Sequence, residues 1–166
     1  MELFAELAHA LGHEFADLSG EQAAVLVLRL LVAGLLGALL GWNRERSGKA
    51  AGLRTYALVA VGSAGFVAVP QQAGLGPDAV SRVAQGLLAG IGFLGAGSIV
   101  KSGAADHVVG LTTAAGIWLT AAVGVAAGMG RGGSAIVLGL FGWFTLAVVG
   151  RWERRIDPGH NRPTGS

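Results

Sequence analysis

The sequence has no cysteine among its 166 residues. A disulfide framework, a thiolate metal site and a thiol nucleophile are therefore excluded, and the redox compartment is left open. Charged residues are also scarce, at 13% of the chain, whereas about 25% is usual for a soluble domain. Hydrophobic residues make up 52%, and the mean hydropathy is +0.60. The shortage of charge indicates a protein that folds in a lipid bilayer.

Carboxylates are missing from the five long apolar segments that separate the charged clusters. A helix of twenty residues measures about 30 Å, which is enough to cross the hydrocarbon core. We therefore expect an all-α membrane protein with one transmembrane domain over residues 21–150. Its five transmembrane helices are predicted over residues 23–42, 53–69, 83–100, 108–127 and 134–150. Pro70 is expected to end the second helix, and residues 71–78 to form a loop.

The first span is preceded by an amphipathic segment. Residues 1–20 place apolar side chains on one side of a helix, and acidic residues with two histidines on the other. We interpret this segment as an interfacial helix that lies on the membrane surface; a metal site at His9 and His13 is the alternative. Ser19 and Gln22 match a capping box, which predicts the start of the first span.

Lysine and arginine are unevenly divided between the two sides of the predicted bundle. With the N-terminus outside, the outer side receives only Arg82 and Arg131. The cytoplasmic side receives Arg44, Arg46, Lys49, Arg54, Lys101, Arg151, Arg154, Arg155 and Arg162. The positive-inside rule therefore predicts an N-out, C-in topology, with residues 151–166 as a basic cytoplasmic tail. Because these residues flank hydrophobic spans, membrane lipid is the expected partner and nucleic acid is not.

The chain has 29 glycines, and several recur at spacings of four within the spans. Residues 90–95 match the pattern G-x-G-x-x-G, but they lie inside an apolar span and not between a strand and a helix, so dinucleotide binding is rejected. Glycines at a spacing of four let transmembrane helices approach closely, and a break that exposes backbone carbonyls in the third helix is the alternative. The predicted packing glycines are Gly37, Gly41, Gly86, Gly90, Gly92, Gly95, Gly97 and Gly110.

Arg29 is the one charged residue well inside a predicted span. Because a charge in hydrocarbon costs at least a few kcal/mol, its side chain is expected to face protein or to reach toward the outer surface. A role as an anchor and a role as an interior functional residue are both open. The candidate partners are Asp17, Glu21, Gln85 and backbone carbonyls.

The cytoplasmic end of the predicted bundle carries a group of polar residues. The predicted cluster comprises Arg44, Glu45, Arg46, Arg54, Thr55, Asp106, Thr112 and Thr113. In the expected topology the second and fourth helices begin here, so their free N–H groups and positive dipole ends favour an anion. Three anions fit this surface: a lipid phosphate, a soluble phosphate compound or the carboxylate of Glu45. The alternative is a structural network of Glu45 with Arg46 or Arg54.

Three motifs resemble those of a known family. They are Gly41-Trp42-Asn43-Arg44-Glu45-Arg46 with Ala51-Gly52-Leu53-Arg54-Thr55, then Gly90-Ile91-Gly92-Phe93-Leu94-Gly95-Ala96-Gly97, then Gly110-Leu111-Thr112-Thr113-Ala114-Ala115 with Trp118. In order and spacing, residues 29–129 resemble the MgtC/SapB family of bacterial inner-membrane proteins. The family usually has an acid at Asn43, a histidine at Tyr56 and often a basic residue at Val109, and this chain departs from it there. Some members carry a further cytoplasmic domain after the last span.

The resemblance implies a role in acclimation to low magnesium and, in pathogens, in survival inside host cells. The expected function is a regulator of magnesium-linked ion homeostasis that acts through other membrane proteins; an oligomeric transporter or channel for Mg²⁺ or another ion is the alternative. Mg²⁺ prefers carboxylate oxygens, and the spans contain none, which disfavours a path within one subunit. A pore lined by carbonyls and threonines in an oligomer stays open, and a homodimer is favoured. No catalytic motif is recognisable, so enzyme activity, a cofactor and a resident metal are not expected.

Overall fold

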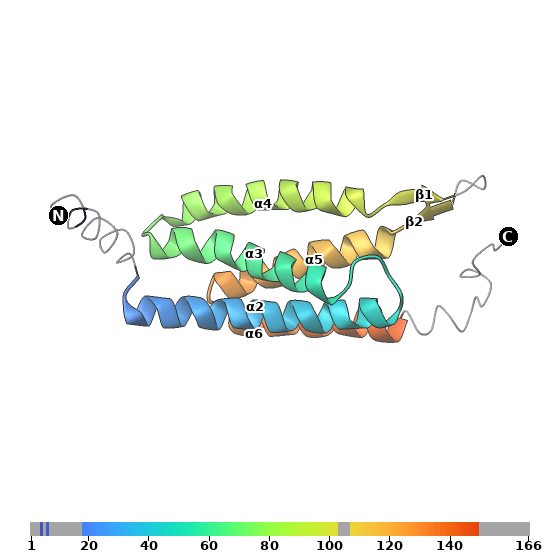
Figure 1. Ribbon diagram of the computed structural model, residues 1–166, viewed down its shortest axis with the longest axis horizontal. Helices are drawn as coiled ribbons and strands as arrows, with labels where there is room; N and C mark the ends of the chain where they lie inside the picture. Colours follow the sequence, from blue (N-terminus) through green and yellow to red (C-terminus); the bar gives the residue numbers. More distant parts are fainter. Residues whose placement is uncertain (1–3, 5, 7–17, 103–106, 150–166) are drawn as a thin grey trace.

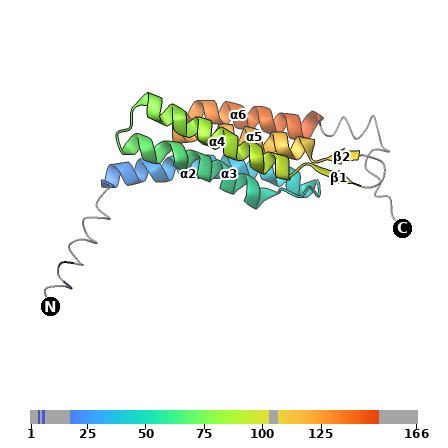
Figure 2. The same ribbon diagram turned by 90° about the horizontal axis from the view of Figure 1, so that it is seen from above.

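The computed structural model describes residues 4, 6, 18–102 and 107–149. Within this part of the chain, five helices lie side by side and consecutive helices run in opposite directions (Figures 1 and 2). Their bounds are Gly20–Arg46 for α2, Leu53–Gln72 for α3, Pro77–Gly97 for α4, Leu111–Gly128 for α5 and Gly132–Phe144 for α6, which a π-helical turn at Thr145–Val149 continues. The predicted interfacial helix and basic tail lie almost entirely outside the described residues.

The helices have the length and surface of a membrane protein. α2, α3, α4 and α5 are each long and apolar enough to cross a bilayer, and α6 is a shorter apolar helix. Large apolar side chains lie on the outer surface; Leu35, for example, is 70% exposed and Phe93 is 84% exposed. So much exposed apolar surface is unfavourable in water, whereas lipid solvates it. The prediction of an all-α membrane protein is confirmed.

A short hairpin that was not predicted connects α4 to α5. β1 (Val100–Ser102) pairs antiparallel with β2 (His107–Val109), and Val100 lies opposite Val109. The hairpin shortens both neighbouring helices, because α4 ends before residue 100 and α5 begins after residue 108. The strand residues include apolar, β-branched valines. Hydropathy alone therefore could not separate this strand pair from the helices beside it.

α3 continues through Pro70, so the prediction that it ends there is wrong. Pro70 lies in the last turn, where its missing N–H removes one helical hydrogen bond and little helix remains to be disrupted. Its carbonyl accepts a hydrogen bond from the N–H of Leu75 at 3.0 Å, and Gly74, with a φ of +79°, turns the chain. α4 then begins with Pro77, whose fixed φ suits the first position of a helix. The predicted loop is shortened to residues 73–76.

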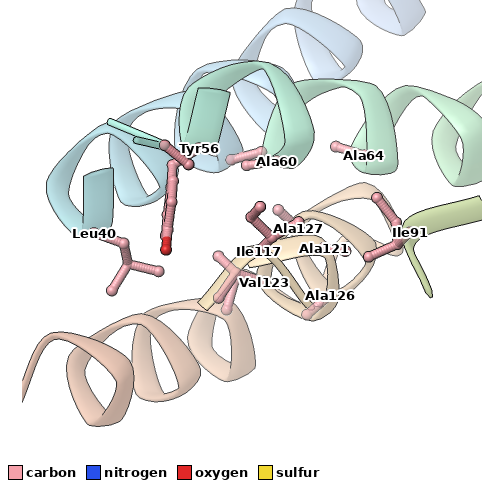
Figure 3. Close-up of a cluster of buried hydrophobic side chains, with 13 residues drawn as sticks. Leu40, Tyr56, Ala60, Ala64, Ile91, Ile117, Ala121, Val123, Ala126 and Ala127 are labelled. Atoms are coloured by element: carbon pink, nitrogen blue, oxygen red, sulfur yellow. The ribbon is translucent and has the colours of Figure 1, made fainter. Parts of the chain in front are cut away.

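The buried core lies where α2, α3 and α5 meet. Most of its residues are small, such as Ala33 and Ala60, and Tyr56 is its largest fully buried side chain (Figure 3). Gly37 and Gly41 of α2 lie directly against α3. A Cβ at Gly37 would be 2.8 Å from the Cβ of Ala60, which is closer than real Cβ atoms come. These small residues let the helix backbones approach each other, as membrane helices often do.

The glycines of α4 do not have this role within the subunit. Gly95 makes an ordinary contact with Ala114 of α5. For the other four, no described part of the chain outside their own helix lies within 4 Å of the position that a Cβ would occupy: Gly86, Gly90, Gly92 and Gly97. The expectation that these four pack α4 against its neighbours is wrong within this subunit, because α4 buries only Val80, Ile91 and Gly95.

The bundle has two ends, which we name after two arginines of α2. At the Arg44 end, α2, α4 and α6 finish, and α3 and α5 begin (Figure 1). At the Arg29 end, α3 and α5 finish. The two arginines are fifteen positions apart in one helix, so they are separated by about 22 Å along its axis.

Candidate functional site

Arg44 lies in the last turn of α2 and is turned into the bundle. Only 6% of its surface is exposed, although it carries a positive charge. Its Nη2 donates a hydrogen bond of 2.7 Å to Oγ1 of Thr113, in the first turn of α5. Its Nε is buried and has no hydrogen-bond partner. A buried cation with an unused donor is costly, and Arg44 is the only buried charge among the described residues.

Tyr56 of α3 meets the same threonine and also interacts with the Arg44 side chain. It is fully buried, points from α3 into the interior (Figure 3), and its hydroxyl donates a long hydrogen bond of 3.4 Å to the carbonyl oxygen of Thr113. Gly116 makes room for it, because a Cβ there would overlap the Tyr56 hydroxyl. In the sequence, Tyr56 stands where the resembling family usually has a histidine, and a buried hydrogen-bonding role was not predicted for it. Its single polar atom in an apolar run could have suggested a buried partner.

Glu45 caps the start of α3. Its Oε2 accepts a hydrogen bond of 2.8 Å from the backbone N–H of Leu53, the first residue of that helix. The preceding Gly52 leaves space for the carboxylate, because a Cβ there would lie 2.7 Å from Oε2. Among the described residues, Glu45 forms no ion pair with Arg46 or Arg54, so the alternative of a network with these arginines is not found. The backbone N–H satisfies this carboxylate instead.

The remaining members of the predicted cluster lie at the same end without joining this contact. Arg46 is exposed and stacks over the ring of Trp42, with its guanidinium carbon 4.9 Å from the ring centre. No hydrogen bond links Arg54, Thr55 or Thr112 to another described side chain. Asp106 lies outside the described residues. The structure thus brings together Arg44 and Thr113 from the prediction and adds Tyr56.

The first turn of α5 has no side-chain cap. Its N-cap is Gly110, with a φ of +97°, and a Cβ there would overlap the carbonyl oxygen of Ser98. Only glycine suits this left-handed and crowded position, so Gly110 acts as a turn residue and not as the packing glycine that was predicted. The first helical hydrogen bond runs from Ala114 to Gly110. The three preceding N–H groups, at residues 111–113, therefore have no partner within the helix.

Arg29 meets the other end of α5, where it finds hydrogen-bond acceptors. Its Nη1 donates to the carbonyl oxygen of Gly128 at 2.8 Å and to Oε1 of Gln71 at 3.2 Å. Gly128 is the last residue of α5, where free carbonyls and the negative end of the helix dipole favour a cation. Of the predicted partners, the backbone carbonyls are the correct choice. Gln71, and not Gln85, supplies the polar side chain because α3 extends beyond Pro70 to reach it.

Metal ligands do not gather anywhere in the described part of the chain. No group of three or more histidine, cysteine, aspartate or glutamate side chains there could hold a metal ion. The buried polar and charged side chains of the described residues are Arg44, Ser63, Thr113 and Thr120. The only one with a formal charge is positive, so the interior is better suited to meet an anion than a cation.

Comparison with known proteins identifies the family. The profile of the MgtC family matches residues 30–155, which is well over half of the chain. The chain belongs to the MgtC family. One relative is Protein SrpB of Synechococcus elongatus, which is 48% identical to this chain over 141 residues. The match covers 78% of this chain and 75% of SrpB. The family predicted from the three sequence motifs is confirmed.

Two further relatives are longer than this chain. Protein MgtC of Salmonella typhimurium is 47% identical over 105 residues, which cover 63% of this chain and 44% of MgtC. YhiD of Escherichia coli K12, which is named as a candidate magnesium transporter, is 39% identical over 136 residues, or 76% of this chain and 59% of YhiD. The chain therefore spans about half the length of these two relatives. No solved structure matches it.

Proposed function

We propose that this protein is a multi-pass protein of a bacterial inner membrane that regulates magnesium-linked ion homeostasis without catalysing a reaction, by binding other membrane proteins. The link to magnesium comes from the relatives, because YhiD is named as a candidate magnesium transporter. The regulator is favoured over the transporter by one observation: among the described residues, the only buried formal charge is that of Arg44. A buried cation repels Mg²⁺, and none of the described carboxylates is buried to attract it.

Transport by an oligomer is the second candidate, since the name of YhiD favours it. Purified protein reconstituted alone into liposomes separates the two. With a Mg²⁺-sensitive dye inside, the regulator gives the same influx as empty liposomes, and an added ionophore shows that the dye responds. Influx that increases with the amount of protein would instead support transport.

The proposed function includes a defined orientation of the helix bundle in the membrane. Among the described basic residues outside the core, Arg46, Lys49, Arg54 and Lys101 lie at the Arg44 end, and Arg82 and Arg131 at the other. This excess supports an orientation with the Arg44 end in the cytoplasm and the N-terminus outside. Ala50 and Ala73 are exposed, and they lie in connections at opposite ends of the bundle. With an impermeant thiol reagent added to whole cells, Ala73→Cys should label and Ala50→Cys only after lysis. The reverse pattern would contradict this orientation.

A partner protein is proposed to dock at the Arg44 end through Arg54, which is exposed and has no described side-chain partner. Arg82 is the matched control, because it is an exposed arginine at the other end of the bundle. In cells that lack this protein, growth at low magnesium should be restored by wild type and by Arg82→Gln, and much less by Arg54→Gln. Equal restoration by both variants, at equal membrane levels, would remove Arg54 from the docking surface.

A further inference from the structure

We propose that the first turn of α5, together with Arg44, binds the phosphate of an anionic phospholipid whose acyl chain lies in the groove between α4 and α5. This site goes beyond the proposed function and does not depend on magnesium. Three features of the described structure carry it: a helix start without a side-chain cap, a buried arginine with an unused donor, and an adjoining apolar groove.

The helix start is the first feature. Gly110 has to be glycine because of its φ of +97° and its closeness to Ser98, so α5 cannot carry the serine, threonine or aspartate that usually caps a helix. No described group accepts a hydrogen bond from the backbone N–H of Leu111, Thr112 or Thr113. Leu111 and Thr112 are exposed, which leaves this turn accessible from the membrane surface. Free N–H groups and the positive end of the helix dipole bind phosphate well.

The buried arginine is the second feature, and it points to a ligand of negative charge. Arg44 is more than nine-tenths buried and reaches the same turn through its 2.7 Å hydrogen bond to Thr113. A cation placed at the positive end of a helix is unfavourable unless an anion lies nearby. Among the described residues no carboxylate is bonded to Arg44, and its Nε has no partner. A phosphate at this turn compensates the helix dipole and the guanidinium together.

The start of α3, at the same end of the bundle, shows how an anion can bind the free N–H group of a helix whose N-cap is glycine. There too the N-cap is a glycine, Gly52, and an anion replaces the missing cap: the carboxylate of Glu45 binds the N–H of Leu53. α3 and α5 both begin at this end, and both lack a capping side chain at the N-cap. One helix has an anion from its own neighbouring segment. The other has an arginine beneath it and takes its anion from the lipid.

The groove is the third feature, and it selects a lipid over a soluble phosphate. It has a volume of about 320 Å³, and its walls are small or apolar: Ile91, Gly92, Gly95, Ala96, Ile99, Ala114, Ala115 and Trp118. Ala114 directly follows Thr113, so the groove begins where the phosphate-binding turn ends. Apolar walls of this kind suit an acyl chain, and a headgroup at the first turn of α5 would place that chain alongside α4 and α5.

The experiment measures thermal unfolding of the purified full-length chain in a neutral detergent. Phosphatidylglycerol is added to one sample, phosphatidylcholine with the same acyl chains to a second, and inorganic phosphate at matched ionic strength to a third. At a lipid concentration a hundredfold above its Kd, phosphatidylglycerol should raise Tm by at least about 5 °C. Phosphatidylcholine and inorganic phosphate should raise it much less. Equal shifts from both lipids, or an equal shift from inorganic phosphate, would overturn the assignment.

Two variants locate the lipid. Arg44→Met should lose the shift, whereas Arg29→Met, which removes an arginine from the other end of the same helix, should keep it. Ala96→Phe fills the groove from an exposed position and should reduce the shift without touching the phosphate site. If Arg44→Met fails to fold, Ala96→Phe still decides. A full shift in Ala96→Phe would overturn the assignment, because the acyl chain would then not lie in this groove.

Discussion

Arg29 and Arg44 are two arginines of α2 that meet the two ends of α5. Arg29 reaches its last residue and donates to the carbonyl of Gly128, where a cation is favoured by the helix dipole. Arg44 reaches its first turn, is more deeply buried, and keeps one donor without a partner. The same residue type thus closes the bundle at one end and leaves it electrostatically incomplete at the other.

The difference in hydrogen bonding distinguishes a structural arginine from an arginine that can still bind a ligand. Both residues carry the same charge and lie in the same transmembrane helix, so neither of these properties alone indicates function. What distinguishes them is whether the groups that they meet can accept their hydrogen bonds. Arg29 meets a carbonyl and an amide oxygen, whereas Arg44 meets the hydroxyl groups of Thr113 and Tyr56, next to the first turn of α5.

The largest loss of stability is expected for a substitution of Gly110, whose backbone conformation starts α5 at the Arg44 end. Gly110→Ala should lower the free energy of unfolding by more than about 3 kcal/mol, because it adds left-handed strain to an overlap with Ser98. Gly48→Ala is the control: its φ is +64°, but no described residue other than its chain neighbours lies within 4 Å of the added Cβ. It should cost only about 1 kcal/mol. Equal losses in a detergent unfolding series would show that the contact with Ser98 contributes nothing.

An intermediate effect is expected at the other end. Arg29→Met should lower stability by about 1–3 kcal/mol, because the carbonyl of Gly128 and the side chain of Gln71 lose their donor. Arg82→Met, on the exposed surface of α4, should change stability by less than about 0.5 kcal/mol. If the two variants unfold at the same denaturant concentration, Arg29 does not cap α5.

The smallest effect is expected for the carboxylate that caps α3. Glu45→Gln keeps the shape of the side chain but removes the charge beside the helix start, which should cost about 0.3–1 kcal/mol. Its effect should add to that of Arg54→Gln within about 0.5 kcal/mol, because no ion pair joins these two described residues. A larger coupling energy in the double-mutant cycle would establish a direct pair that the structure does not contain.

Much of the fold follows from the sequence because its signals are local. Apolar runs between charged clusters predicted the helices, and Ser19 with Gln22 predicted the start of α2, where both capping-box hydrogen bonds form. The exact ends of the helices were harder to predict. Pro70 stays in α3 because it falls in the last turn, and the strand pair between α4 and α5 contains valines that also suit an apolar helix.

The candidate site was predicted only in part because it depends on which face of each helix is covered. Gly37 and Gly90 look alike in sequence, yet one lies against α3 and the other has no neighbouring element within 4 Å of an added Cβ. Likewise, the charges of Arg44 and Arg54 are equivalent in a topology diagram. Only the tertiary structure shows that Arg44 is buried against Thr113 while Arg54 is exposed.

The most direct test of the difference between the two ends is to count the lipids that each variant retains. Wild type, Arg29→Met and Arg44→Met are reconstituted in equal amounts of phosphatidylglycerol and phosphatidylcholine, extracted in a mild detergent, and weighed by native mass spectrometry. Loss of one charge-assisted hydrogen bond corresponds to at least about a tenfold weaker site. Wild type and Arg29→Met should therefore retain one phosphatidylglycerol that Arg44→Met loses. Retention by Arg44→Met at the wild-type level, or equal loss in both variants, would contradict an anion site at the Arg44 end.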